Sequence, residues 1–345
     1  MENRTAYLVA PETFEVRDSS MPQVGDDDVL VEIKHVGVCG SDVSCYHNPF
    51  GGRRKIELPI VLGHECAGVV IETGKNVKNL KPGDNVALEP GIPCYHCDLC
   101  LSGRYNLCRD VIFMAAYPYK TAALHRYVTH PQSFTFKLPD NMSTVEGSMV
   151  EPLAVGVHAA ARANAQPGNS VIILGVGTIG LTTLLACRAR GITNITVVDI
   201  FDNRLEFAAK MGATRTINSA NEDVVAKVME DTDGLGIDLV FETAGNTQTA
   251  AMTSDLVKFG GKVIMVGNIH GKTPYDFMIM NRKEADILSV FRYRNIYPAV
   301  IELISGGIMP VKEMVTATYP FEQVGEAFDK ALNDKQNQIK VIIEL

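Results

Sequence analysis

The stretch Val171-Ile172-Ile173-Leu174-Gly175-Val176-Gly177-Thr178-Ile179-Gly180 decides the fold of this chain. Its apolar beginning predicts a strand buried on both faces, and the G-x-G-x-x-G pattern predicts a tight turn into a helix. Gly175 permits the turn, Gly177 lets a pyrophosphate approach the backbone, and Gly180 lets the helix pack close to the strand. The amides of Thr178 and Ile179 open that helix, where the helix dipole attracts phosphate charge.

A second strand, Ile195–Val198, ends in Asp199, about 20 residues beyond the last glycine, where an acid accepts the ribose hydroxyls of a dinucleotide. The alternative is an ordinary βα turn without a nucleotide, and the position of Asp199 argues against it. Further strands and helical runs follow at regular intervals, and together they predict a doubly wound parallel sheet over residues 154–290. The six expected strands begin near Val171, Ile195, Thr214, Asp238, Lys262 and Asp286.

Residues from about 5 to 90 have the pattern of short strands joined by turns, with another β stretch near 125–138, which predicts a barrel-like β domain. The tail 291–345 contains two helical runs, near Tyr297–Ser305 and Gln323–Leu332, and a last strand, Ile339–Ile343. This tail is too short for a domain and its strand needs a sheet partner, so we expect it to return to the N-terminal domain.

The composition indicates an ordinary globular protein, with 345 residues, 46% apolar and 21% charged, and a net charge of −8. The negative charge argues against a general nucleic-acid or membrane-surface role. No apolar run approaches the roughly 18 residues of a membrane helix, and the N-terminus lacks the layout of a signal peptide. We therefore expect a cytoplasmic protein whose eight cysteines stay reduced, so that clustered cysteines indicate a metal.

One such cluster lies in a lobe at 91–110, where Cys94-x-x-Cys97-x-x-Cys100 is followed by Cys108. Four thiolates at this spacing suit a closed, tetrahedral, structural zinc site. An iron–sulfur centre uses related cysteine runs, and disulfides are the other alternative.

A second set is dispersed along the chain and comprises Cys39, His64, Glu65 and Glu151. A catalytic zinc needs three protein ligands and one open position. Cys39 and His64 are the expected direct ligands. Glu65 and Glu151 compete for the third place, directly or through a water.

The pattern Gly63-His64-Glu65-x2-Gly68-x5-Gly74-x2-Val77 resembles the signature of the zinc-containing medium-chain alcohol and polyol dehydrogenases, and the likeness extends over the whole chain. The stretches Val150–Ala159 and Val290–Tyr293 are most similar to the sorbitol (L-iditol 2-) and xylitol dehydrogenases. The resemblance implies a GroES-like β-barrel catalytic domain at 1–153, a Rossmann domain at 154–290 and a return to the catalytic domain at 291–345.

The resemblance also implies roles for individual residues. Cys39, His64 and Glu151 match the catalytic zinc set, Glu65 a second carboxylate at the metal, and Ser41 the hydroxyl that passes on the alcohol proton. Polyol binding is implied for Arg292 and Tyr293, and a pocket wall for Phe113. The implied cofactor contacts, besides the glycine turn, are Asp199, Arg204, Val266, Gly267 and Phe291.

The chain departs from the family at Ser44, where simple alcohol dehydrogenases have the histidine that ends the proton relay, and at the pocket positions Cys45, Ala116 and Tyr117. These departures leave the relay exit and the preferred polyol open. Without the resemblance, the alternatives are a surface ion-pair role for Arg292 and a core position for Tyr293.

The function implied is oxidation of a polyol secondary alcohol to a ketose, with zinc and NAD, by a homo-oligomer, most simply a tetramer. The alternative within the family is an alcohol, butanediol or threonine-type dehydrogenase. The alternative outside it is a non-catalytic nucleotide-sensing protein, against which the complete ligand set argues.

Overall fold

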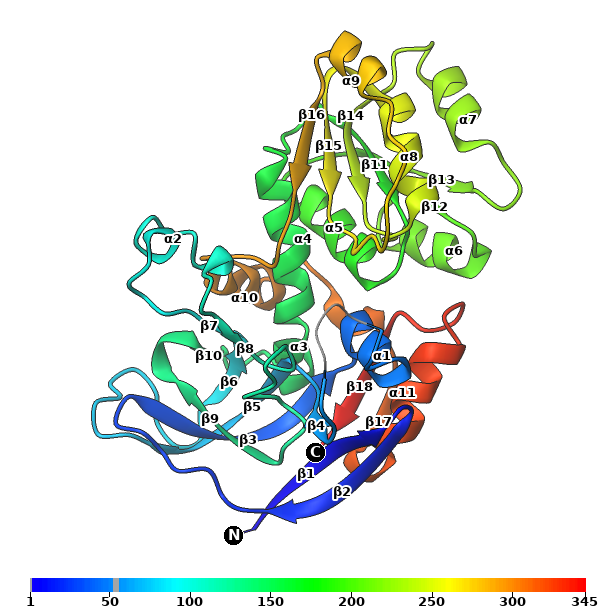
Figure 1. Ribbon diagram of the computed structural model, residues 1–345. Helices are drawn as coiled ribbons and strands as arrows, with labels where there is room; N and C mark the ends of the chain where they lie inside the picture. The colour runs from blue at the N-terminus through cyan, green and yellow to red at the C-terminus, as the bar shows by residue number, and fades with distance from the viewer. Residues whose placement is uncertain (1, 52–55) are drawn as a thin grey trace. The chain divides into compact units, whose positions relative to one another are not determined.

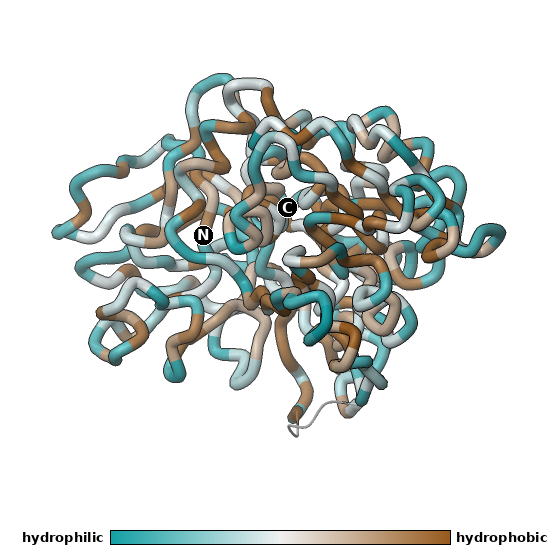
Figure 2. Tube along the Cα trace, turned by 90° about the horizontal axis from the view of Figure 1, so that it is seen from above, coloured by the Kyte–Doolittle hydropathy of each residue, from teal (hydrophilic) through white to brown (hydrophobic). Residues whose placement is uncertain are grey.

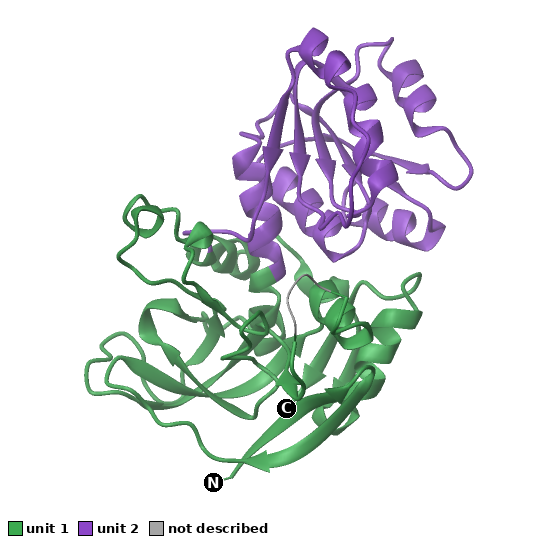
Figure 3. Cartoon of the chain, viewed as in Figure 1, with its two compact units in different colours: residues 1–151, 297–345 green, residues 152–296 purple. Residues whose placement is uncertain are grey.

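The computed structural model describes residues 2–51 and 56–345, which form two compact units (Figures 1 and 3). Unit 1 comprises Met1–Glu151 and Tyr297–Leu345, and unit 2 comprises Pro152–Ile296. The divisions that we expected from the sequence lie at 153/154 and 290/291. Within residues 2–51 and 56–345, no helix combines the length and the apolar character needed to cross a bilayer.

Unit 2 is built on a six-stranded parallel sheet in the order β13-β12-β11-β14-β15-β16. The order reverses between β11 and β14, which is where a doubly wound sheet binds its ligand. This arrangement confirms the fold class predicted from the glycine turn. The strands are β11 (Ser170–Leu174), β12 (Asn194–Asp199), β13 (Arg215–Asn218), β14 (Ile237–Glu242), β15 (Val257–Met265) and β16 (Asp286–Ser289).

Helices cover both faces of this sheet (Figure 1). On one side α4 and α5 approach closely, because Gly156 has no side chain to hold it away from the backbone of Thr182. On the other side α8 packs between α7 and α9. The helices are α4 (Val150–Arg162), α5 (Thr178–Ala189), α6 (Asp202–Lys210), α7 (Val224–Asp231), α8 (Thr247–Leu256) and α9 (Phe277–Lys283).

Unit 1 contains a seven-stranded sheet in the order β10-β6-β5-β3-β18-β17, with β9 also paired to β3. A three-stranded sheet, β2-β1-β4, and the antiparallel pair β7-β8 complete it. The last strand of the chain, β18, pairs with β3 and with β17. The strands are β1 (Asn3–Ala10), β2 (Thr13–Ser19), β3 (Asp28–Gly37), β4 (Ile60–Val61), β5 (Glu65–Thr73), β6 (Asn85–Leu88), β7 (Gly91–Ile92), β8 (Ile112–Phe113), β9 (Tyr127–Pro131), β10 (Thr135–Lys137), β17 (Val315–Pro320) and β18 (Lys340–Glu344).

The sequence pattern did not predict the helix α1 (Gly40–His47) within the β region. Its sequence is a weak helix former, so its stability comes from packing. The rings of Phe14, Tyr46 and Phe328 contact one another at centroid distances of 4.9–5.4 Å and fix α1 to α11. The other helical segments of unit 1 are α2 (Asp98–Leu101), η1 (Tyr105–Leu107), η2 (Gln132–Phe134), α3 (Thr144–Ser148), α10 (Tyr297–Ser305), η3 (Val311–Met314), η4 (Phe321–Gln323) and α11 (Val324–Asn333).

Each unit has a hydrophobic core of its own. Figure 2 marks the apolar stretches of the chain in brown. In unit 1 the core includes Ile33, Leu88 and Phe328, all nearly inaccessible to solvent. In unit 2 it includes Ile172, Val240 and Val263 from neighbouring strands. Rigid cores of this kind hold the loops at the strand ends, where the candidate site residues lie.

Candidate active site

The ends of two paired strands bring together three of the expected metal ligands. Cys39 follows β3 and caps the N-terminus of α1, while His64 and Glu65 enter β5 after a turn at Gly63, whose φ is 89°. Gly37 of β3 is the register partner of Glu65. Cys39, His64 and Glu65 each offer a ligand atom within 4.8 Å of the others. A thiolate, an imidazole and a carboxylate so close together form a donor set suited to zinc.

Asp42 lies behind His64, and its role was missed from the sequence. Its Oδ2 is 3.2 Å from Nδ1 of His64, and both side chains are buried. Burial opposes a charge on the imidazole, yet the neighbouring Asp42 and Cys39 outweigh that effect and raise the pKa of His64 well above its ordinary value. With Nδ1 facing Asp42, Nε2 is the nitrogen left for a metal. The available signal was the position of this acidic residue, three residues after Cys39 in the sequence.

Lys340 was also missed, because it is distant in sequence. Its Nζ donates to Oε2 of Glu65 at 2.6 Å and to the carbonyl oxygen of Val38 at 3.1 Å. The side chains of Lys340 and Glu65 are each only 2% exposed. Burial lowers the pKa of Lys340, but the charges of Glu65, Cys39 and Glu151 and the hydrogen bond to Glu65 together outweigh burial and raise the pKa. A buried lysine thus partners a carboxylate of the metal cluster.

Glu151, the other carboxylate expected at the metal, comes from a separate element. It lies in the first turn of α4 and is buried. Its charge contributes to raising the pKa values of Cys66 and Glu89, after the larger effect of burial. Among the described residues, the ligand atoms within 4.8 Å of one another are those of Cys39, His64 and Glu65, without Glu151.

Ser41 and Phe113 both lie beside this cluster. The hydroxyl of Ser41 donates to Sγ of Cys39 at 3.3 Å. The ring of Phe113, at the end of β8, has its centroid 5.6 Å from that of His64. On the next turn of α1, Sγ of Cys45 is 3.6 Å from the hydroxyl of Tyr119. Ser44 instead bonds the carbonyl of Gly40 within the helix, at 2.9 Å.

The four cysteines of the lobe form the second cluster, with Sγ atoms all within 4.8 Å of one another. The amide of Cys94 donates to Sγ of Cys108 at 3.4 Å, and backbone hydrogen bonding, first from His96, lowers the pKa of Cys94 to about 6. Zinc binds the thiolate form of cysteine, so four sulfur donors, one of which ionises readily, fit a closed zinc site. All eight cysteines of the chain are free thiols.

The glycine turn of unit 2 has the close approaches that a dinucleotide fold requires. A Cβ on Gly180 would lie 1.9 Å from the carbonyl oxygen of Gly175, and one on Gly175 would lie 2.8 Å from Ala244. At Gly177, by contrast, a Cβ would meet only Nη1 of Arg204, at 3.7 Å. The backbone at Gly177, the N-cap of α5, therefore has free space beside it, whereas Gly175 and Gly180 are tightly packed. Free space at the N-terminus of a helix suits the binding of a phosphate group.

The carboxylate of Asp199 accepts hydrogen bonds from the backbone of the glycine turn and of the residues that follow β12. Its Oδ2 accepts from the amide of Val176 at 2.8 Å, and its Oδ1 accepts from the amides of Ile200 and Phe201 at 2.8 and 3.2 Å. Nη1 of Arg204 is 4.0 Å from Asp199. The acid at the end of β12 thus joins the second strand to the turn after the first.

The remaining predicted residues also belong to unit 2. The amides of Val266 and Gly267 both donate to the carbonyl of Glu242 at 2.9 Å, which joins the loops after β14 and β15. The guanidinium of Arg292 lies 4.8 Å from the ring centroid of the exposed Phe291. Arg292 has a φ of 54°, and Tyr293 is buried.

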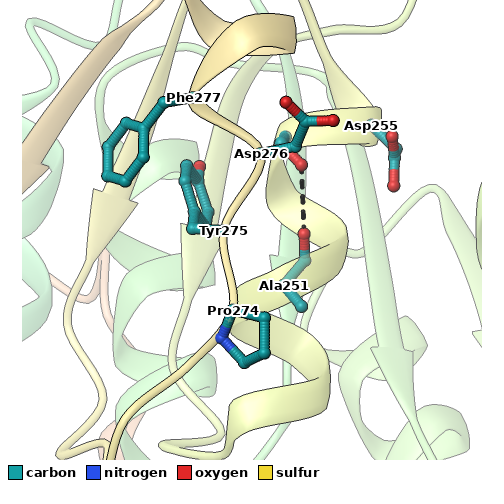
Figure 4. Close-up of a pocket in the computed structure, with 7 residues that line it drawn as sticks. Ala251, Asp255, Pro274, Tyr275, Asp276 and Phe277 are labelled. Atoms are coloured by element: carbon teal, nitrogen blue, oxygen red, sulfur yellow. Dashed lines mark hydrogen bonds between the residues drawn. The ribbon is translucent and has the colours of Figure 1, made fainter.

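A surface hollow in unit 2 contains none of the predicted site residues (Figure 4). It lies between the C-terminal turns of α8 and the segment that leads into α9, where Tyr275 and Phe277 stand with ring centroids 5.4 Å apart. The side chain of Asp276 caps the N-terminus of α9 by accepting hydrogen bonds from backbone amides of its first turn. The hollow therefore adds nothing to the metal or dinucleotide sites.

Comparison with known proteins adds independent observations. The family model described as "Alcohol dehydrogenase GroES-like domain" matches residues 25–140, and that described as "Zinc-binding dehydrogenase" matches residues 178–306. An uncharacterized zinc-type alcohol dehydrogenase-like protein, YdjJ, of Escherichia coli is 47% identical, over 100% of this chain and 99% of its own.

A sorbitol dehydrogenase of Bacillus subtilis is 40% identical, over 99% of this chain and 96% of its own. Among solved structures, an oxidoreductase/dehydrogenase of unknown specificity involved in membrane biogenesis from Escherichia coli superposes with a TM-score of 0.96 at 47% identity. That match covers 100% of this chain and 99% of the other.

Proposed function

Since the chain belongs to the zinc-containing medium-chain dehydrogenase family, we propose that it oxidises a secondary alcohol of a polyol to the ketose and transfers the hydride to NAD. The observation that carries the proposal is the cluster of Cys39, His64 and Glu65, with Ser41 against the cysteine. The 40% identity to a sorbitol dehydrogenase supports the polyol as substrate class.

Cys39 and His64 would hold the catalytic zinc, with Glu151 or Glu65 as the third ligand, and the metal would supply Lewis-acid chemistry that acidifies the alcohol. Other side chains of the protein orient the imidazole, move the proton and line the pocket. The carboxylate of Asp42 faces Nδ1 of His64 at 3.2 Å, and its negative charge favours this orientation of the ring. Ser41 accepts the proton of the alcohol and passes it toward solvent, and Phe113 forms an apolar wall beside His64.

We assign recognition of the remote hydroxyls to Arg292 and Tyr293, on the strength of the family resemblance. The Arg292 guanidinium offers five donors in a rigid fork, and neighbouring hydroxyl oxygens suit such a fork. Stacking on Phe291 restrains that guanidinium, which reduces the entropy lost on binding.

The glycine turn would hold the pyrophosphate of the dinucleotide, and Asp199 favours NAD over NADP. The carboxylate lies at the strand end, where the 2′-phosphate of NADP would approach it, and like charges repel. Arg204 is a nearby group that would favour a phosphate. Its Nη1 lies 4.0 Å from Asp199, however, so the carboxylate already offsets part of the attraction that the guanidinium would offer a phosphate.

The proposal includes a cytoplasmic homotetramer. Cysteines that gather in metal sites are typical of a reducing compartment, which supports the cytoplasm as the location. Strand β16 is at the edge of its sheet, and Phe259, Ile287 and Phe291 on or beside β15 and β16 are exposed, which favours pairing with a second copy. Light scattering at micromolar concentration tests this, and a monomer mass would contradict it.

A substrate panel tests the proposed function. The zinc-loaded protein is given NAD and, in turn, xylitol, ribitol, sorbitol, galactitol, threonine, 2,3-butanediol and 2-butanol, and NADH formation is followed by absorbance. The proposal expects turnover of at least one pentitol or hexitol above that of the small alcohols. Turnover confined to threonine, butanediol or 2-butanol would reassign the protein within its family, and no turnover of any alcohol would favour a non-catalytic nucleotide-binding role.

A further inference from the structure

Tyr119 contacts the helix α1, which begins at the metal cluster. Its hydroxyl lies 3.6 Å from Sγ of Cys45, and both side chains pack, partly buried, against the core of unit 1. Cys45 follows Ser41 by four residues in α1, so the two side chains share a helix face, with Cβ atoms about 5–6 Å apart. The contact with Tyr119 is therefore about one helical turn from the hydroxyl that we place at the reacting alcohol.

The segment that carries Tyr119 also carries Phe113, the ring beside His64. The amide of Ala116 donates to the carbonyl of Phe113 at 3.2 Å, and the amide of Tyr119 donates to the carbonyl of Ala116 at 2.6 Å. Two successive turns thus fix Tyr119 relative to Phe113, whose ring centroid lies 5.6 Å from that of His64. Tyr119 is therefore tied to the metal cluster from two directions, through α1 and through this segment.

These contacts close into a circuit that begins and ends at proposed metal ligands. Each member is joined to the next by a side-chain contact, by hydrogen-bonded turns or by the helix α1. The members are, in order, His64, Phe113, Tyr119, Cys45, Ser41 and Cys39. An alcohol bound at the metal would have Ser41 and Phe113 as its first neighbours, and the next group in both directions is the pair of Tyr119 and Cys45.

The chemistry of this pair suits a hydroxyl group of the substrate. Burial is the largest effect on both groups and raises the pKa of Cys45 and of Tyr119, so both stay uncharged at neutral pH. A thiol is a weak hydrogen-bond partner, so the phenol can exchange it for a stronger one at little cost. A phenol also both donates and accepts, as an alcohol does.

We propose that Tyr119 is a substrate-binding residue whose hydroxyl exchanges the Cys45 thiol for a hydroxyl of the polyol, a few carbon atoms from the reacting one. The inference rests on the proposed function, since it presupposes a polyol whose reacting oxygen lies at the metal. Tyr119 belongs to unit 1, which also contains Cys39, His64 and Glu65. A tyrosine that only supports the fold would affect polyols and simple alcohols alike.

The experiment compares the zinc-loaded wild type with Tyr119→Phe, which keeps the ring and removes the hydroxyl. The matched control is Tyr319→Phe, because Tyr319 lies in β17 and packs, partly buried, against the same core. For each protein, kcat/KM is measured with NAD for the best polyol of the panel, for the monodeoxy derivatives of that polyol, and for 2-butanol.

We expect Tyr119→Phe to lower kcat/KM for the polyol by about 3- to 10-fold, the effect of one neutral hydrogen bond, and to leave the value for 2-butanol unchanged. One monodeoxy derivative should lose a similar factor in the wild type. The same derivative should lose nothing further in Tyr119→Phe, because the enzyme group and the substrate group act on each other. Tyr319→Phe should behave as the wild type does.

A fluorine label on the ring of Tyr119, beside the hydroxyl, gives a second readout that does not depend on the variant. In the zinc-loaded protein with NADH, which prevents turnover, the fluorine resonance should shift when the polyol is added. The resonance should stay in place when 2-butanol is added at the same concentration.

An equal fall for the polyol and 2-butanol in Tyr119→Phe, an unchanged value for the polyol, or a fluorine resonance that the polyol does not move would overturn the role of Tyr119 and leave polyol oxidation intact. A wild type that prefers 2-butanol to every polyol of the panel would overturn both the inference and the proposed function on which it rests.

Discussion

Oδ2 of Asp42 lies 3.2 Å from Nδ1 of His64, and both side chains are almost fully buried. A carboxylate behind a ligating imidazole fixes the ring and increases its basicity. We predict that Asp42→Asn, which keeps the size of the side chain, weakens zinc binding at Cys39 and His64 by about 10- to 100-fold. Competition with a metal buffer of known affinity measures this change.

The cysteine lobe is the internal control for that experiment, because its four sulfur ligands do not involve Asp42. Its zinc should stay bound in the Asn variant at the same chelator concentration. Unchanged affinity at the labile site, or equal loss at both sites, would show that Asp42 does not act through His64.

The stability of the folded protein depends on pH through the buried carboxyl group of Glu89. Burial raises its pKa from 4.5 to about 7, and the hydroxyl of Tyr105 donates to its Oε1 at 2.7 Å. Because the folded-state pKa is above the ordinary value, the native state binds the proton more tightly, and this contribution to stability is lost as pH rises from about 4.5 through 7. Glu89→Gln keeps the acceptor for Tyr105 without the ionisation.

We therefore predict that Glu89→Gln gains stability relative to wild type between pH 5 and pH 8, by about 1–3 kcal/mol. Urea unfolding at both pH values measures the difference, with the exposed Glu313→Gln as control. A constant difference across that range would show that Glu89 titrates no differently in the folded and unfolded states.

The Rossmann half of the fold could be predicted almost completely from the sequence, because its signals are local. Buried parallel strands have continuous apolar runs, and the glycine spacing fixes the turn between β11 and α5. The helix α1 could not be predicted, since its stability depends on Tyr46 packing against Phe14 and Phe328, which are distant in the chain.

For cofactor choice, we predict that the wild type prefers NAD and that Asp199→Ser shifts the ratio of kcat/KM for NAD over NADP toward NADP by about tenfold or more, equivalent to about 1.4 kcal/mol. The serine removes the negative charge that now accepts from the amide of Val176 at 2.8 Å. Steady-state kinetics with both cofactors measure the ratio. An equal or greater kcat/KM with NADP in the wild type would contradict the assignment.

Arg292 should select polyols over simple alcohols. We predict that Arg292→Ala lowers kcat/KM for the best polyol by about 10- to 150-fold, since one charged hydrogen bond contributes about 1.5–3 kcal/mol. The value for 2-butanol, which lacks further hydroxyls, should hardly change. The exposed Arg282→Ala is the control. An equal fall for both substrates would make Arg292 structural or a cofactor contact.

The metal cluster was only partly predictable. The Gly-His-Glu signature located His64 and Glu65, and Cys39 was recognised beside a strand end, because these signals lie within short stretches. Lys340 lies 275 positions beyond Glu65 and reaches it only because β18 pairs with β3. A buried partner of this kind has no local signature, since a lysine in a strand is ordinarily at the surface.

The measurement that tests the central claim most directly is kcat/KM of the zinc-loaded protein with NAD for its best polyol, divided by that for 2-butanol, repeated in Cys39→Ser. The account predicts a wild-type ratio of about ten or more, as expected if binding of remote hydroxyls contributes at least about 1.4 kcal/mol to the transition state. It also predicts loss of both activities in Cys39→Ser while the lobe zinc is retained. A ratio of one or less, or a Cys39→Ser variant that still oxidises the polyol, would contradict it.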